Sequence, residues 1–84
     1  MNIEINSVNF TAAQHLTDFI NKKVGKLDTF FDNILVIKVS LKLENNQDLD
    51  NKLAEIHLEV PGSSDLFAKK RSKTFEESID GCIL

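Results

Sequence analysis

The sequence predicts an α+β fold: a two-layer sandwich in the order β-α-β-β-β-α, in which a four-stranded sheet carries two helices on one face. Short stretches alternate apolar and polar residues with the period of two that is typical of strands. Two further stretches repeat apolar residues with the period of a helix. The alternating stretches are apolar on one side and charged on the other, so both helices are expected to cover the same sheet face.

The first strand and the first helix are predicted in the N-terminal part of the chain. Residues 2–6, "NIEIN", alternate as a short strand does. Thr11 and Gln14 have the spacing of a capping box, which predicts that a helix begins here. The helix is expected to run from about residue 12 to about residue 32, although Gly25 inside it costs about 1 kcal/mol relative to alanine. Its apolar stripe is Leu16, Phe19, Ile20, Val24, Leu27, Phe30 and Phe31.

Two alternating stretches in the middle of the chain predict an antiparallel hairpin. Residues 34–44 and residues 52–60 alternate clearly, and the polar segment 45–51 between them indicates a turn. The dipeptide Pro61-Gly62 ends the second strand. The inward residues are expected to be Leu35, Ile37, Val39, Leu41 and Leu43 on the first strand and Ala54, Ile56, Leu58 and Val60 on the second.

The C-terminal part of the chain is expected to contain a fourth strand and a second helix. Residues 65–71, "DLFAKKR", can form the strand with Leu66 and Ala68 directed inward. Thr74 and Glu77 form a second capping-box pattern, which predicts the start of the helix. Its apolar positions, at helical spacing, are Phe75, Ile79, Cys82 and Ile83.

Length and composition predict one soluble domain spanning residues 1–84, without internal repeats. The chain has a net charge of −3 and no apolar run long enough for a transmembrane helix, and its N-terminus lacks the pattern of a secretory signal. The single Cys82 excludes an internal disulfide and fits a reducing, cytoplasmic location. A net negative charge argues against nucleic-acid binding unless the cations are concentrated locally.

No catalytic residues, metal ligands or cofactor motifs are predicted. His15 and His57 lie on different elements, and His57 falls on the polar face of its strand, where a solvated histidine is expected. Cys82 lies in the apolar stripe of the last helix and is expected to pack as a small apolar side chain. The chain is therefore not expected to be an enzyme, and no small-molecule substrate is predicted.

The cations are gathered in two clusters. Lys69, Lys70, Arg71 and Lys73 fall within five positions, and Lys22, Lys23 and Lys26 form a second group on the first helix. Helical spacing puts Lys23 inside the apolar stripe, so its stem is expected to cross the edge of the core and place the ammonium at the rim. The charge pattern alone leaves two readings open. The seven cations form either an ordinary solvated surface or a nucleic-acid-binding surface, whose clusters could meet on the helical side.

The order of these segments resembles the ribosome hibernation-promoting factor family, also called ribosome-associated inhibitor A or sigma-54 modulation proteins. The resemblance is carried by "KKVGKLDTFFDNI", by the alternating strand after it and by "TFEESID". The stretches "LKLEN" and "DLFAKKRSKTFEE" look most like versions from Bacteroidetes-type bacteria.

This resemblance implies a fold similar to a double-stranded-RNA-binding domain. It also implies binding to ribosomal RNA in the decoding channel of the small ribosomal subunit. Such proteins silence translation in stationary phase, and several of them promote ribosome dimers. Lys23 and Lys26 match the basic pair of the family's first helix, whereas the cations at 69–73 fall where members vary.

The sequence departs from the family at its C-terminal end. In the family the last helix continues for several turns and ends in a basic stretch, whereas here the chain stops at "DGCIL". The resemblance thus implies a short form with a truncated last helix. An alternative hypothesis follows from the same feature: a protein-interaction module that self-associates weakly through apolar surface of the short helix.

Overall fold

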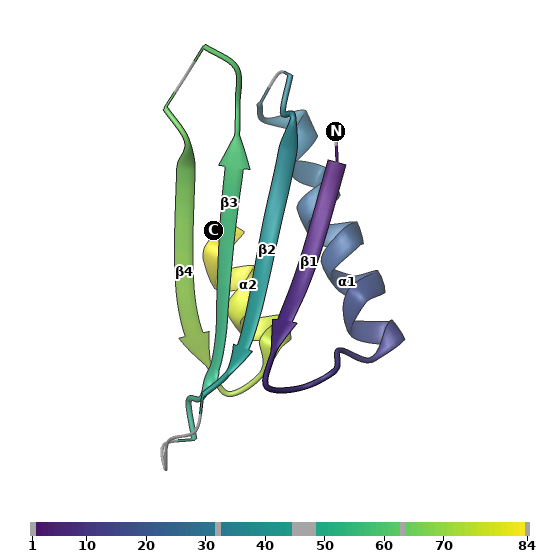
Figure 1. Ribbon diagram of the computed structural model, residues 1–84, viewed down its shortest axis with the longest axis vertical. Helices are drawn as coiled ribbons and strands as arrows, with labels where there is room; N and C mark the ends of the chain where they lie inside the picture. Colours follow the sequence, from purple (N-terminus) through teal and green to yellow (C-terminus); the bar gives the residue numbers. More distant parts are fainter. Residues whose placement is uncertain (1, 32, 45–48, 63, 84) are drawn as a thin grey trace.

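The structure is a computed structural model and describes residues 2–31, 33–44, 49–62 and 64–83. Figure 1 shows a sheet of four strands with the helices behind it. The elements in chain order are β1 (Asn2–Val8), α1 (Gln14–Gly25), the 3₁₀ helix η1 (Lys26–Thr29), β2 (Val36–Leu43), β3 (Lys52–Glu59), β4 (Leu66–Ser72) and α2 (Phe75–Ile83).

The strands lie in the spatial order β1-β2-β3-β4, the same order as in the sequence. β1 and β2 are parallel, because α1 returns the chain to the end of the sheet where β1 began. β2 pairs with β3, and β3 with β4, in antiparallel register. The predicted hairpin is therefore confirmed, although most of its turn, residues 45–48, lies outside the described residues. In the hairpin Leu41 pairs with Ala54 and Ser40 pairs with Glu55. Because side chains alternate along a strand, this register determines which sheet face each residue of β2 and β3 lies on.

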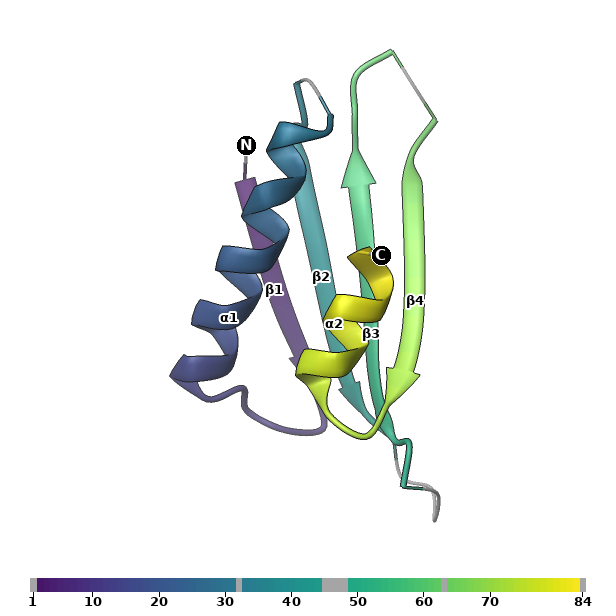
Figure 2. The ribbon, with the colours of Figure 1, turned by 180° about the vertical axis from the view of Figure 1, so that it is seen from behind.

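Both helices cover one face of the sheet, as Figure 2 shows, and the apolar core lies between the two layers. The β-α-β-β-β-α sandwich predicted from the alternation is thus confirmed. Ile20, Ile37, Leu41 and Ile79 are fully buried at its centre. The phenyl rings of Phe10 and Phe75 stack with their centroids 4.7 Å apart and close the core where α2 begins.

The prediction for the inward face of β2 was wrong at its first residue. Leu35 precedes the strand and is 58% exposed, whereas Ile37, Val39 and Leu41 are buried as expected. Alternation predicts burial only within the strand, which begins at Val36, and just before it Ile34 is buried in place of Leu35. On β4, the expected inward residue Leu66 remains 39% exposed, because α2 covers only part of the length of β3 and β4 (Figure 2).

The first helix is shorter than predicted, and its predicted cap is absent. The α-helix ends at Gly25, and the tighter η1 follows as far as Thr29. The N-cap is Ala13, whose carbonyl accepts hydrogen bonds from the amides of Leu16 and Thr17. The N-cap lies two residues after Thr11, so the Thr11 hydroxyl does not cap the helix. The side-chain amide of Gln14 does not reach back to Thr11 but donates to Asp18 Oδ1 at 2.8 Å.

The second helix begins as predicted, with Thr74 as its N-cap. The Glu77 amide donates to Thr74 Oγ1 at 3.1 Å, which satisfies one of the free donors of the first turn. The fully buried Ser78 ties this helix to the sheet, because its hydroxyl lies 2.6 Å from the Lys52 carbonyl oxygen on β3. The apolar stripe indicated which face of α2 is buried but not this polar link.

Gly25 and Gly62 have different backbone conformations, so alanine is expected to have opposite effects on stability at the two positions. Gly25 has helical φ and ψ of −60° and −26°, and apart from the adjoining backbone nothing lies within 4 Å of the position of an added Cβ. Gly25→Ala should therefore raise the free energy of unfolding by about 0.5–1 kcal/mol and the melting temperature by roughly 2–8 °C. Gly62 has φ +76°, so Gly62→Ala should lower stability by about 1 kcal/mol. Urea unfolding of both variants measures this, and destabilisation by Gly25→Ala would contradict the helical geometry at residue 25.

Candidate nucleic-acid interface

The sheet separates the cations that the sequence placed together. On β4, Lys70 pairs with the buried Ala54 and is directed to the helical side. Lys69 and Arg71 alternate to the opposite, outer face, beside Glu55 and Leu53 of β3. Lys73 is exposed in the bend between β4 and α2. The possibility that the whole 69–73 cluster joins the first-helix cluster on the helical side is therefore ruled out for Lys69 and Arg71.

The cations of β4 have a structural explanation, because β4 is an edge strand of the sheet. Charged side chains, lysine above all, discourage an exposed edge from pairing with another chain. Arg71 also forms an ion pair with Glu44, in which its Nε–H donates a hydrogen bond to the Glu44 carboxylate. This hydrogen bond holds the pKa of the Glu44 carboxyl below its usual range. On the other side of the sheet, the stem of Lys70 lies against α2, where Gly81 leaves room for it.

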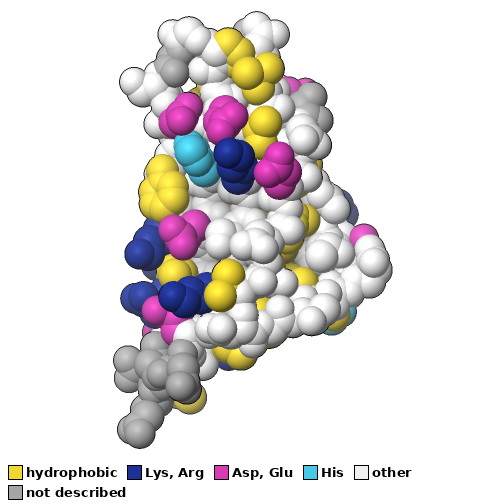
Figure 3. Space-filling view, viewed as in Figure 1, with side chains coloured by type: hydrophobic (Ala, Val, Ile, Leu, Met, Phe, Trp, Pro, Cys, Tyr) yellow, Lys and Arg dark blue, Asp and Glu magenta, His cyan; other side chains and the backbone are white. Residues whose placement is uncertain are grey.

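The outer sheet face carries charges of both signs, as Figure 3 shows. Lys38 Nζ lies 3.0 Å from Glu59 Oε1, and this hydrogen bond raises the pKa of Lys38. His57 Nε2 lies 3.1 Å from Asp65 Oδ2, so this histidine has a partner as well as contact with solvent. Because carboxylates accompany the cations, this face does not present the basic surface that RNA binding requires.

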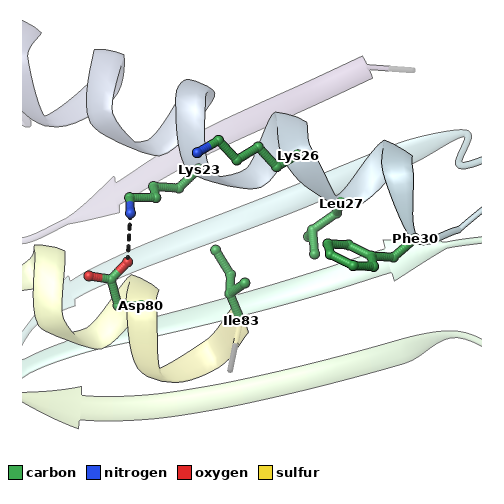
Figure 4. A pocket seen from close by; sticks show the side chains of 6 residues that line it. All are labelled: Lys23, Lys26, Leu27, Phe30, Asp80 and Ile83. Carbon is green, nitrogen blue, oxygen red and sulfur yellow. Dashed lines mark ion pairs between the residues drawn. The ribbon is translucent and has the colours of Figure 1, made fainter.

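The helical side contains a groove between α1–η1 and α2 with a volume of about 380 Å³. Figure 4 shows Lys23 and Asp80 directed toward each other at one end and the side chains of Leu27 and Phe30 toward the other. Lys26 and Ile83 complete its lining. Apolar surface inside the groove and two lysines along one wall make this the described site best suited to a ligand that is both flat and anionic.

The side chain of Lys23 is directed as predicted, with its stem at the edge of the core and its ammonium at the rim. Its side chain is 38% exposed, and its ammonium lies 3.6 Å from Asp80 Oδ1 and 5.5 Å from the centroid of the Phe19 ring. The stem therefore crosses the core edge and the charge is held at the rim. Lys22 and Lys26, which lie on one flank of the stripe at helical spacing, are both exposed. Asp80, which comes from the other helix, was not part of the predicted site.

Two adjacent phenylalanines at the end of η1 differ completely in environment. Phe31 packs against the core, as the apolar stripe predicted, but Phe30 is 76% exposed and lines the groove. The 3₁₀ turn changes the angle between successive side chains, which removes Phe30 from the buried stripe. The prediction of a buried Phe30 was wrong, and nothing else in the sequence indicates an exposed ring.

Other chemistry is not favoured by the described residues. Across the described ranges there is no group of three or more His, Cys, Asp or Glu that could hold a metal ion. Burial raises the pKa of the Cys82 thiol, and its Sγ lies 3.5 Å from the Ala54 carbonyl oxygen, so the neutral thiol is a poor nucleophile. His15 is exposed on α1. Among the described residues no helix has the length and apolar character needed to cross a bilayer.

Comparison with known proteins identifies the family. Residues 3–83 match the family described as sigma 54 modulation protein / S30EA ribosomal protein. Among curated protein sequences, none matches the chain.

Solved structures support the same relationship. The N-terminal domain of Protein Y from Thermus thermophilus is 26% identical, with a TM-score of 0.81, and the match covers 99% of this chain and 88% of that one. A ribosomal subunit interface protein from Coxiella burnetii, 18% identical, shows the same fold with a TM-score of 0.84, and the match covers 99% of this chain and 86% of that one. With the family match covering nearly the entire sequence, the chain belongs to the sigma 54 modulation protein / S30EA ribosomal protein family, a family of ribosome-associated proteins that are not enzymes.

Proposed function

We propose that this protein binds ribosomal RNA in the decoding channel of the small ribosomal subunit and so inhibits translation in stationary phase, in the cytoplasm. Family membership carries the proposal, because the matched family is one of ribosomal proteins. The groove between the helices supports it physically. Lys23 and Lys26 line this groove, and they are the two positions that resemble the family's basic pair.

The net charge of −3 makes the position of the contact surface important. An acidic protein meets RNA favourably only where its cations outnumber its carboxylates locally. The helices also carry Asp18, Asp28, Glu76 and Glu77, but two lysines, Lys23 and Lys26, and only one carboxylate, Asp80, line the groove itself. Within the described ranges neither Lys22 nor Lys26 forms an ion pair. On the outer face, Lys38 and Arg71 are already paired with carboxylates. We therefore assign RNA binding to the groove side, with Lys22, Lys23, Lys26 and Lys70, and not to the sheet face.

Sucrose-gradient sedimentation with purified ribosomal subunits tests the proposal. The protein should sediment with small subunits at low salt and not with large subunits. It should also inhibit in vitro translation in proportion to the fraction of small subunits occupied. Messenger RNA or transfer RNA bound beforehand should compete with it, because all would occupy the same channel. Failure to sediment with small subunits at 50 mM salt would refute the proposed function.

A second candidate function, weak self-association, is favoured by one observation. An apolar hollow of about 170 Å³ lies beside the C-terminal part of α2, over β3 and β4. It is lined by Leu27, Phe31, Leu58, Leu66 and Ile83, among others, and the partly exposed Leu66 forms part of its rim. Sedimentation of the protein alone over a range of concentrations measures this directly. A constant monomeric sedimentation coefficient would exclude self-association.

Asp80 should weaken RNA binding at the groove, because its carboxylate lies 3.6 Å from the Lys23 ammonium and would be close to any phosphate bound there. Asp80→Asn is expected to tighten binding to small subunits by about two- to fivefold, in line with the free energy of an exposed ion pair. Glu59→Gln is the matched control, since it removes the carboxylate paired with Lys38 on the outer face. Equal effects of the two substitutions would show that only net charge matters, contrary to the assignment.

A further inference from the structure

The exposed ring of Phe30 is the feature of the groove that packing does not explain. Its side chain is 76% exposed, whereas the neighbouring Phe31 is packed against the core. The backbone beneath the ring is nevertheless well held. The amides of Phe30 and Phe31 both donate to the Leu27 carbonyl oxygen, at 3.0 and 3.1 Å, and the Leu27 side chain is buried. The fold thus presents an aromatic ring to solvent on an anchored turn.

The surroundings of this ring combine apolar surface with cations. Leu27 and Ile83 lie beside it in the groove, and Lys26 and Lys23 line the same groove toward its other end. Aromatic rings flanked by cations are the recurring arrangement for single-stranded nucleic acid, in which a base stacks on the ring while the backbone phosphates meet the cations. The volume of about 380 Å³ is in the range of sites that hold ligands of this size.

We infer that Phe30 is a stacking platform for one unpaired nucleobase, with the adjoining phosphates directed along the groove toward Lys26 and Lys23. The inference rests on the proposed function and makes it more specific. It states that the groove recognises an unstacked base in a loop, a bulge or a strand end, and not the backbone of a continuous RNA duplex. Bases within a duplex already stack on each other and cannot reach the ring.

The absence of tryptophan and tyrosine from the chain allows a direct optical test. Phe30→Trp introduces a single fluorophore at the proposed platform. Phe67→Trp is the matched control, because Phe67 is 60% exposed and pairs in register with His57 on the outer face. A short adenine-only RNA strand should quench the fluorescence of Trp at 30 and leave that of Trp at 67 unchanged. The same strand annealed to its uridine complement should quench neither.

Binding to small subunits provides the second measurement. Phe30→Leu keeps an apolar side chain but removes the ring, so its affinity for small subunits in co-sedimentation should be roughly tenfold lower. Phe30→Tyr keeps the ring and should bind as tightly as the unmodified protein. Because the ring is mostly exposed, neither variant should change the melting temperature by more than a few degrees.

The outcomes separate this inference from the proposed function. If the unmodified protein binds small subunits but Phe30→Leu binds equally well, the stacking platform is refuted and the proposed function stands. Loss of subunit binding in Phe30→Leu without quenching of Trp at 30 by single-stranded RNA would place a ribosomal protein, not a base, against the ring, and would also overturn the inference. If the unmodified protein does not bind subunits at all, both proposals are refuted.

Discussion

Leu41→Asp is expected to abolish folding, whereas Ser40→Asp, one residue earlier on the same strand, should leave a folded domain. Leu41 is fully buried in the middle of β2 and pairs with the buried Ala54. Removing a leucine side chain from such a site costs about 3–5 kcal/mol. Placing a carboxylate there costs several kcal/mol more. The sum is comparable with the whole stability expected for a domain of this length, about 4–13 kcal/mol.

Ser40 provides the matched control because its side chain lies on the other face of the same strand. Its pairing partner is Glu55, so an aspartate at 40 would meet a like charge and lose up to about 1 kcal/mol. Lys38 and Lys42 lie two residues away on the same face and partly offset this repulsion. Thermal melts followed by circular dichroism should show a cooperative transition for Ser40→Asp and none for Leu41→Asp. The reverse result would mean that the strand register is shifted by one residue.

The parts of the fold that follow from periodicity could be predicted from the sequence. In β2 and β3, alternation identified the buried faces, because a two-residue period assigns each side chain to one of two sides. Ile37, Val39 and Leu41 are buried as this argument requires. The same reasoning failed at Leu35 and Phe30, where the backbone leaves the regular strand or α-helix that the period assumes.

The features of the candidate site that sequence reasoning missed depend on contacts between elements. Asp80 meets Lys23 only because α2 packs beside α1, and nothing in the spacing of either helix indicates this pair. The division of the 69–73 cluster likewise depends on the register between β4 and β3, which sends Lys70 to one face and Arg71 to the other. Local composition showed that the cations are clustered, but their direction is a tertiary property.

Salt dependence should separate the groove from the outer face as the RNA-binding surface. The cations on the helical side are Lys22, Lys23, Lys26 and Lys70, so about four phosphate contacts are available. With a slope near −0.7 per contact for single-stranded RNA, log K should fall by about 2.8 for each tenfold increase in salt. Affinity for small subunits should then drop about fiftyfold between 50 and 200 mM salt.

Replacing both groove lysines should flatten this dependence. The double variant Lys23→Ala with Lys26→Ala loses two contacts, so its slope should decrease in magnitude by about 1.4, and it should no longer inhibit in vitro translation effectively. Its stability should change by no more than about 1 kcal/mol, because Lys26 is exposed and the Lys23–Asp80 pair is open to solvent. Fluorescence anisotropy of labelled protein against small subunits at several salt concentrations gives the slope.

The double variant Lys38→Ala with Lys42→Ala is the control for the loss of two positive charges. Both lysines lie on the outer face of β2, and Lys38 is already paired with Glu59 at 3.0 Å. Their removal should lower affinity slightly through net charge but leave the slope near −2.8, because no phosphate contact is lost. If this pair flattened the slope and the groove pair did not, the RNA-binding surface would be the sheet face. Lys69 and Arg71 of β4, which lie on that face, would then contact RNA as well as discourage the edge strand from pairing with another chain.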